Sequence, residues 1–300
     1  MSYGGYGDDR PRSPFGGDMI RWVGALIIAL FGLAMYMFRT ETNPVTGERQ
    51  HIAMNVDQEK ALGLQAAPEM AEKMGGEIDP RDDDRAALVS EVGRRIVRRS
   101  DANRSPYVDN FHFHLLNDPK TINAFALPGG QVFITRALFD RLQDEAQLAG
   151  VLGHEIGHVI ERHSAQQMAS GQLGQLLTTA VGVGASGGDD RGQKATMAAA
   201  MANQMLSLRY SRGDESQADG IGLKYMAQAG YDPRQMLAVM QILKEASEGN
   251  RQPEFLATHP LPETRLEAIK QEIQRTYPGG VPSDLTRGRP IGGGRRTEGR

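Results

Sequence analysis

The sequence of 300 residues contains no cysteine. Disulfide bonds, thiolate nucleophiles and cysteine-ligated zinc sites are therefore excluded, while the redox compartment stays open because a cysteine-free chain is stable in any of them. Aromatic residues make up only 6% of the chain, and the formal net charge is -3. This charge gives no global basis for binding nucleic acid, which we do not expect as a partner.

Long apolar runs are also scarce. The exception is an uncharged run from Trp22 to Phe38, WVGALIIALFGLAMYMF. Its length is at the short end of the roughly 17–25 residues that cross a bilayer. Arg21 and Arg39 flank it, as interface anchors do. A cleaved signal peptide and a buried core helix are the alternatives, but the run is long for a signal peptide and no small-x-small cleavage site follows. We expect a retained transmembrane anchor at residues 20–39, whose flanking charges favour a cytoplasmic N-terminus only weakly.

Composition divides the remaining chain into further segments. Residues 1–19 are rich in Gly, Pro, Ser and Asp, and we expect them to be disordered. Residues 40–57 contain Asn-Pro and Thr-Gly pairs and predict a turn-rich linker. A globular domain is expected over residues 58–276. The Gly- and Arg-rich residues 277–300 are expected to form a second disordered tail.

Apolar residues three and four positions apart predict that most of the domain is helical. The predicted helices cover residues 59–74, 84–99, 143–168, 195–210, 213–229, 233–248 and 262–275. Alternation from Phe111 to Leu115 predicts one strand, and two β-prone runs around Pro128-Gly129-Gly130 predict a hairpin. The expected fold class is therefore α+β, predominantly α-helical with a small β-sheet.

One helical stretch, LAGVLGHEIGHVIERH at residues 148–163, carries the pattern H-E-x-x-H. His154 and His158 are four apart, so they share a helix face and can both bind one tetrahedral zinc ion. Glu155 lies about 100° further round and can reach a water molecule without being a ligand. A chance match to three fixed positions arises on the order of once per hundred such chains, so the pattern needs a third ligand.

The nearby third ligand of the pattern H-E-x-x-H-x-x-G-x-x-H is missing, because Ser164 stands where its last His would be. His163 comes one position early and is expected on a different face, as a structural or surface residue. A distant Glu is the other known solution, and Glu215 in YSRGDESQADG is the candidate. Asp219, one turn later, can hydrogen-bond the free ring nitrogen of a ligand His. On spacing alone, a solvated acidic helix face explains this pair better.

Four motifs in order add a resemblance: NAFALPGG, LAGVLGHEIGHVIERHS, YSRGDESQAD and THPLPETRLEAI. Across about residues 43 to 275 the chain resembles the membrane-associated gluzincin zinc peptidases grouped around the CAAX prenyl endopeptidase, HtpX and BepA, and especially the periplasmic BepA-like members. The resemblance implies a zincin-like domain and a family role for Asp219 beside the site. It also implies Glu155 as catalytic base and one zinc ion per chain, with ligands His154, His158 and Glu215.

The same resemblance places His259, just before Pro260, at the zinc site. It either steadies the transition-state oxyanion or occupies the open coordination position as a gate, whereas an ordinary turn histidine is the simpler reading. Arg265 is expected to pair with a nearby carboxylate.

The hairpin strand that begins at Asn123, Ala124 and Phe125 is a candidate edge that binds substrate backbone by strand addition. An ordinary covered strand is the alternative, and the sequence does not separate the two. The loop at residues 181–193 and the Met-rich run after it are either part of the core or a lid over the cleft.

We therefore expect a membrane-anchored zinc endopeptidase with an extracytoplasmic, periplasmic domain, acting on unfolded or misassembled envelope proteins in quality control. Envelope assembly machinery is a candidate partner. The alternative is a chaperone or assembly factor on the same zinc-binding fold, with a gated site and little turnover. A zinc-free structural protein is disfavoured by the complete set of ligands and Glu155.

Overall fold

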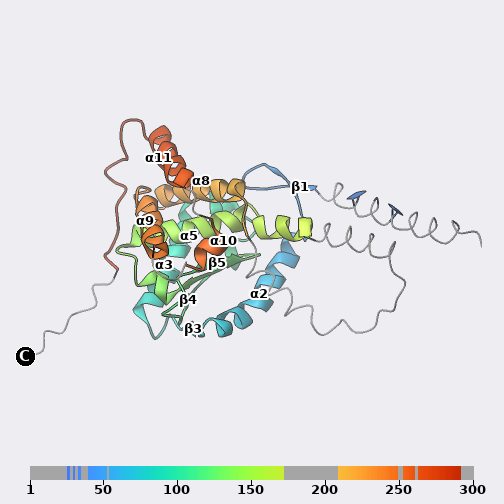
Figure 1. Cartoon of the computed structure of the whole chain (residues 1–300), viewed down its shortest axis with the longest axis horizontal. Coiled ribbons are helices and arrows are strands. Elements are labelled where there is room, and N and C mark those ends of the chain that lie inside the picture. The colour runs from blue at the N-terminus through green and yellow to red at the C-terminus, as the bar shows by residue number, and fades with distance from the viewer. Residues whose placement is uncertain are drawn as a thin grey trace, which may run out of the picture.

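The computed structural model describes residues 26, 27, 30, 33, 34, 40–52, 54–171, 209–248, 253–260 and 263–291. The strands are β1 (Thr40–Thr42), β2 (Arg49–His51), β3 (Glu77–Ile78), β4 (His112–Leu116), β5 (Ala124–Leu127) and β6 (Gln131–Thr135). The helices are α2 (Val56–Lys73), α3 (Asp84–Arg99), α4 (Arg136–Phe139), α5 (Glu145–Ile160), α8 (Arg212–Gln228), α9 (Gln235–Ser247), α10 (Phe255–Thr258) and α11 (Glu263–Thr276). The predicted α+β class with predominant helix is confirmed (Figure 1).

A four-stranded sheet in the order β3-β4-β6-β5 forms one layer. The predicted hairpin is confirmed: β5 and β6 pair antiparallel, with Phe125 opposite Phe133. Its turn needs glycine because Gly129 and Gly130 have φ angles of 80° and 109°, in the left-handed region that other residues avoid. Strand β4 joins β6 in parallel, a pairing that the sequence pattern did not predict.

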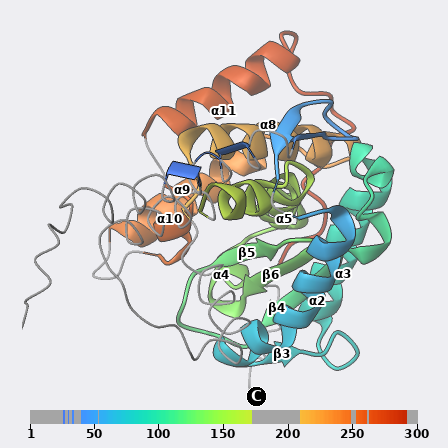
Figure 2. The same ribbon diagram turned by 90° about the vertical axis from the view of Figure 1, so that its right-hand side faces the viewer.

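Helix α5 occupies the centre of the domain. Figure 2 shows it running between the sheet and α8, with α11 on the outer side of α8. Every residue of α5 from Glu145 to Ile160 is buried. Neighbouring elements cover this helix on all sides, so the H-E-x-x-H pattern lies in the interior of the domain.

The predicted boundaries agree best where capping signals are strong. Helix α3 has the predicted bounds and begins after Asp83, whose side chain accepts a hydrogen bond from the Arg85 backbone N–H. The helix predicted over 143–168 instead ends at Ile160, since Arg162 has a φ of 57°, and helical structure resumes over residues 163–171. The predicted 181–193 loop, and the predicted helix at 195–210 except its last two residues, lie outside the described residues.

The segment expected to be a linker forms a hairpin instead. Strands β1 and β2 pair antiparallel, and side chains of the hairpin contact the C-terminal end of α5. Asn43 Nδ2 donates to the Ile160 carbonyl at 2.7 Å, and Gln50 Nε2 donates to the Glu161 carbonyl at 2.9 Å. These bonds satisfy carbonyls that a helix end leaves without partners, so the hairpin belongs to the domain.

The expectation of a disordered tail from residue 277 is likewise wrong for residues 277–291. The Glu145 N–H at the start of α5 donates to the Arg289 carbonyl at 3.0 Å, and the Ile291 N–H donates to the Gln143 carbonyl at 2.7 Å. The Arg287 guanidinium also pairs with the buried carboxylate of Asp144 at 2.7 Å. Composition pointed to disorder, but these main-chain bonds fasten the segment to the N-terminal end of α5.

Most of the run predicted to span a membrane lies outside the described residues, as do residues 1–19 and 292–300. Within the part of the chain that the structure describes, none of the helices combines the length and the apolar character that crossing a bilayer requires. The described residues of the run include Leu26, Ile27, Leu30 and Leu33, all with exposed side chains.

Glu161, directly after α5, is a buried carboxyl group with an unusual titration. Its Oε2 accepts hydrogen bonds from Gln50 at 3.0 Å and from Thr46 at 3.4 Å. Burial, reinforced by the nearby charge of Glu48, raises its pKa to about 7. The folded protein therefore retains a proton on Glu161 at pH values where the unfolded chain has released it.

Glu161→Gln should consequently change how stability depends on pH. In the natural chain the free energy of unfolding falls between about pH 4.5 and pH 7, because over that window the folded state binds more protons than the unfolded state. The glutamine lacks this loss, so its stability relative to the natural chain should rise by about 1–3 kcal/mol from pH 5 to pH 8. Urea unfolding at both pH values measures this, with the exposed Glu267→Gln as control. A pH-independent difference would contradict the assignment.

Candidate metal centre

Three helices supply the predicted metal-site residues. Helix α5 presents His154, Glu155 and His158, which are 2%, 0% and 2% exposed. Helix α8 begins with a capping box in which Ser211 and Asp214 exchange side-chain and backbone bonds, and this sets Glu215 in its first turn. His259 is fully buried at the end of α10. The structure thus brings together residues separated by up to about a hundred positions in the sequence.

Small residues allow α5 and α8 to approach closely enough for this. A Cβ atom on Gly157 would lie 2.9 Å from the Ala218 carbonyl oxygen, and one on Gly153 would lie 3.3 Å from the Gly222 carbonyl oxygen. Both neighbours are backbone, which cannot swing aside as a side chain can. The two glycines therefore set the distance between the helix that carries the histidines and the helix that carries Glu215.

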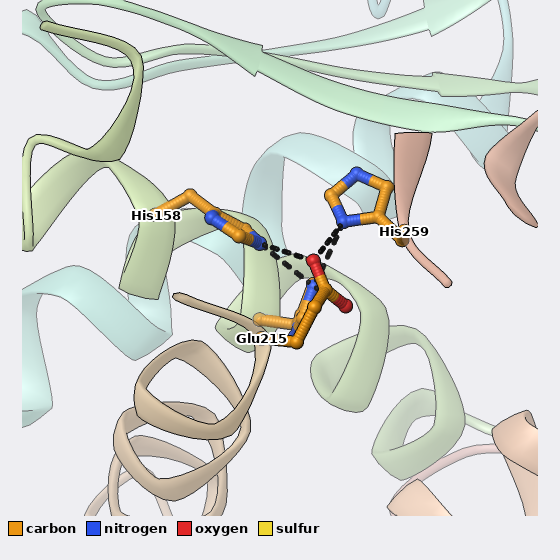
Figure 3. Close-up of side chains that lie close together, drawn as sticks. His158, Glu215 and His259 are labelled. Carbon is orange, nitrogen blue, oxygen red and sulfur yellow. Dashed lines mark hydrogen bonds and ion pairs between the residues drawn. The ribbon is translucent and has the colours of Figure 1, made fainter. Parts of the chain in front are cut away.

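Four donor groups converge in the interior: one ligand atom each from His154, His158, Glu215 and His259, all within 4.8 Å of one another. His154 Nε2 is 3.0 Å from His158 Nε2, and His158 Nε2 is 3.4 Å from Glu215 Oε1. His259 Nδ1 is 2.8 Å from the same carboxylate oxygen. Figure 3 shows His158 and His259 pointing at Glu215 from two sides.

The donor set fits a metal ion. Asp219 Oδ1 lies 2.9 Å from His154 Nδ1, so we assign the proton of that ring to Nδ1 and a lone pair to Nε2. Burial holds the pKa of His158 well below its usual value, which keeps this ring neutral as a metal ligand requires. Ligands about 2.0–2.1 Å from a tetrahedral zinc ion are roughly 3.3 Å apart, close to the separations found here. Without a cation, the lone pairs of these nitrogen and oxygen atoms repel one another. A cation placed between them would attract all of them.

Asp219 and Arg265 form an ion pair behind the cluster. The Arg265 guanidinium donates to Asp219 Oδ2 at 2.6 Å and to Oδ1 at 2.7 Å, and it also pairs with Glu215. Burial opposes ionisation of Asp219, but the guanidinium prevails and holds its pKa below the usual range. The carboxylate that orients His154 therefore stays charged. The sequence predicted a carboxylate partner for Arg265 without naming it. The structure shows two such partners, Glu215 and Asp219, both on α8.

Glu155 differs from every other carboxylate at the site. Both of its carboxylate oxygens are buried and lack a hydrogen-bond partner among the described residues. Burial raises its pKa to about 7. His259 Nε2, which also lacks a hydrogen bond, is 3.8 Å from Glu155 Oε1. Unpaired buried polar atoms are costly, and in folded proteins they mark places where a ligand, ion or water binds.

Two neighbours of His158 were not recognised from the sequence. His163, expected on another face, is 1% exposed, and its Nδ1 lies 2.8 Å from His158 Nδ1. The expectation failed because it assumed one continuous helix, whereas α5 ends at Ile160. Tyr210 stacks on the His158 ring with centroids 3.9 Å apart. No spacing rule signals Tyr210, because it precedes α8 in a non-helical stretch.

The predicted substrate-binding residues lie at and just before the start of β5. Within the described sheet β5 pairs only with β6, so it is an edge strand. Asn123 and Ala124 are buried, and the partly buried Phe125 stacks on Phe133 with ring centroids 4.8 Å apart. The Asn123 side-chain carbonyl oxygen is buried without a hydrogen bond among the described residues.

Fold and centre together define a class: an α+β domain whose central helix carries a buried H-E-x-x-H pattern and whose cluster of candidate metal ligands is completed by a glutamate on a second helix. Comparison with known families agrees with this class. The model of peptidase family M48 matches residues 83–273. The chain belongs to peptidase family M48.

Several characterised proteins are similar to this chain. The beta-barrel assembly-enhancing protease of Yersinia pestis is 32% identical over 246 residues, covering 78% of this chain and 48% of the relative. Its counterpart in Escherichia coli K12 is 33% identical over 195 residues, or 63% and 39% of the two chains. The mitochondrial metalloendopeptidase OMA1 of Schizosaccharomyces pombe is 30% identical over 253 residues, or 84% and 71%. The chain spans less than half the length of the two bacterial proteases.

The α5–α8 crossing yields a test of how the centre is held together. Gly157→Ala should push α8 away from α5, because its Cβ would meet backbone atoms of Ala218 at 2.9 Å. Overpacking of this kind costs about 1–3 kcal/mol. Urea unfolding should show that loss. With zinc ion as the probe of the candidate centre, the affinity measured by chelator competition should fall as well.

Gly220→Ala on α8 is the matched control, because no atom of the described residues lies within 4 Å of its added Cβ. Alanine there should stabilise the helix by about 0.5–1 kcal/mol. Equal behaviour of the two variants would show that the crossing does not depend on Gly157.

Proposed function

We propose that this chain is a zinc-dependent endopeptidase. The observation that carries the proposal is the carboxylate of Glu155, which is buried without a hydrogen bond from any described residue, beside a cluster of four groups that could bind a metal ion. Membership of peptidase family M48 and the similarity to the mitochondrial metalloendopeptidase of Schizosaccharomyces pombe support it.

One zinc ion per chain would be held by His154, His158 and Glu215. Neutral imidazoles and a carboxylate are ligands that zinc accepts readily, and three protein ligands leave the fourth position open for catalysis. When bound, zinc supplies Lewis-acid polarisation of a substrate carbonyl and lowers the pKa of water.

Glu155 is the proposed general base. Its oxygens accept no bond from the described residues, so they are available to take a proton from the attacking water and return it to the leaving amide nitrogen. Burial disfavours the charged form of this carboxyl group and raises its pKa, so Glu155 holds a proton more readily than an exposed glutamate does. Asp219 and Arg265 hold the His154 ring in place during these steps.

Substrate backbone would be held along β5. An edge strand offers unpaired N–H and C=O groups to an extended peptide, and Asn123, Ala124 and Phe125 are at its start. Unfolded or misassembled chains present such extended segments, which is why we propose them as substrates.

His259 has two candidate roles, and its position favours one of them. Its Nδ1 lies 2.8 Å from Glu215 and 3.3 Å from His154 Nε2, inside the donor cluster. There it would fill the fourth coordination position and close the site. This observation favours a gated form of the enzyme, and it keeps the alternative of a chaperone or assembly factor with little turnover. Steadying the oxyanion would require His259 to move out of the cluster.

The anchor and the location are also proposals. Exposed leucine and isoleucine side chains in the described part of the run at residues 22–38 support a single membrane-spanning helix. Similarity to the beta-barrel assembly-enhancing proteases supports an extracytoplasmic, periplasmic domain that acts on misassembled envelope proteins and contacts assembly machinery.

Glu155→Gln tests the mechanism. The change keeps the size of the side chain and leaves the donor cluster intact, but glutamine cannot accept the proton. Casein cleavage by the purified, zinc-loaded full chain should fall on the order of 100- to 10,000-fold, while zinc content stays near one per chain. Cleavage at the natural rate in the variant would eliminate Glu155 as the base.

His259→Ala separates the two roles of that residue. If His259 closes the site, removing it opens the fourth position, and casein cleavage should rise above that of the natural chain. A fall of 100-fold or more with unchanged zinc content would instead favour a role in steadying the oxyanion. The double variant with Glu155→Gln should be inactive, which excludes a contaminating protease.

A further inference from the structure

His163 returns to the metal centre through a break in the helix. On a regular helix a residue five positions after His158 would lie about 140° away from it. Here α5 ends at Ile160, Arg162 adopts the left-handed φ of 57°, and helical structure resumes at His163. The His163 ring thereby stands edge-on to the His158 ring, with centroids 4.9 Å apart and planes at 70°.

Buried contacts hold this break in place. Left-handed backbone is unfavourable for a residue other than glycine. The Arg162 guanidinium donates to Glu59 Oε1 and to Glu41 Oε2, the latter at 2.8 Å, and to the Met54 carbonyl at 2.9 Å. Glu59 in turn accepts a hydrogen bond from the Tyr107 hydroxyl at 2.6 Å. The position of His163 is therefore built into the fold.

A chain of hydrogen bonds defines which nitrogens carry protons. Glu48 Oε2 accepts a hydrogen bond from Gln217 Nε2 at 3.0 Å, so the Gln217 side-chain oxygen faces His163. That oxygen lies 3.1 Å from His163 Nε2 and can only accept, so His163 Nε2 carries a proton and Nδ1 has a lone pair. The lone pair, 2.8 Å from His158 Nδ1, accepts the His158 proton.

This series of hydrogen bonds leaves a lone pair on His158 Nε2. That nitrogen lies in the donor cluster, 3.0 Å from His154 Nε2. Both ligand histidines thus have a partner on the nitrogen that faces away from the cluster. For His154 the partner is the carboxylate of Asp219, and for His158 it is the neutral ring of His163. A partner on the outer nitrogen fixes the tautomer and the orientation of a ligand imidazole.

We propose that His163 is a positioning residue of the metal centre. Its Nδ1 accepts a hydrogen bond from the Nδ1–H of His158, and this bond fixes the tautomer and the orientation in which the His158 Nε2 lone pair points at the metal. The inference rests on the proposed zinc site. It assigns the order Glu48, Gln217, His163, His158 as one hydrogen-bonded relay from the β1–β2 hairpin to the centre.

Three variants of the full chain test the proposal through zinc affinity, measured by competition with a chromophoric chelator. His163→Leu keeps the bulk of the side chain and removes the acceptor, so affinity should fall about 10- to 100-fold. His163→Asn places an amide oxygen near the position of the ring Nδ1 and should restore affinity to within a few-fold of the natural chain. His112→Leu removes an exposed histidine on β4 and should bind zinc normally.

The contrast between leucine and asparagine separates positioning from packing. Equal losses in both variants, or natural affinity in His163→Leu, would overturn the inference while leaving the zinc site in place. Failure of the natural chain to bind zinc would instead overturn the proposed function, and the inference with it.

A spectroscopic measurement on the natural chain keeps the test independent of whether a variant folds. Two-bond ¹H–¹⁵N spectra of the metal-free protein should show His158 protonated on Nδ1 and His163 protonated on Nε2. The opposite tautomer of His163 would contradict the relay.

Discussion

The crossing of α5 and α8 is the contact on which the rest of the structure depends. Donor atoms on two separate helices must come within a few ångströms of one point, and only small residues at the crossing permit this. Gly157 against Ala218 and Gly153 against Gly222 bring the backbones together. The same approach aims Glu215 at the histidines of α5. The close packing of these two helices therefore also sets the geometry of the candidate metal centre.

Burial of the whole of α5 imposes a second requirement, because polar groups without partners are expensive in the interior. The fold meets it from both directions. The β1–β2 hairpin caps the last carbonyls of α5, and residues up to Ile291 cap its first N–H groups. Among the described residues, six buried side-chain atoms lack hydrogen bonds, and four of these belong to Glu155, Glu215 and His259 at the candidate centre. The unmet polar capacity is thus concentrated where substrate and metal would bind.

The helix break at Arg162 links stability to the proposed chemistry. A buried cation held by Glu59 and Glu41 stabilises a left-handed turn that would otherwise be unfavourable. That turn places His163 against His158, a proposed metal ligand, and starts a new helix. The arrangement explains how residues far from the centre in sequence, in the hairpin and in α2, can influence the orientation of a ligand.

The sequence by itself determined the helices with strong periodicity and caps, the hairpin around Pro128 to Gly130, and the H-E-x-x-H pair, since spacing along a helix fixes which side chains share a face. Resemblance directed attention to Glu215, Asp219 and His259, but spacing alone favoured a solvated acidic face. Only the tertiary structure decided that these groups meet, that Arg265 pairs with two carboxylates, and that the segments before α2 and after α11 fasten α5. Contacts between distant segments depend on how helices cross and where they break, and local periodicity carries no information about either.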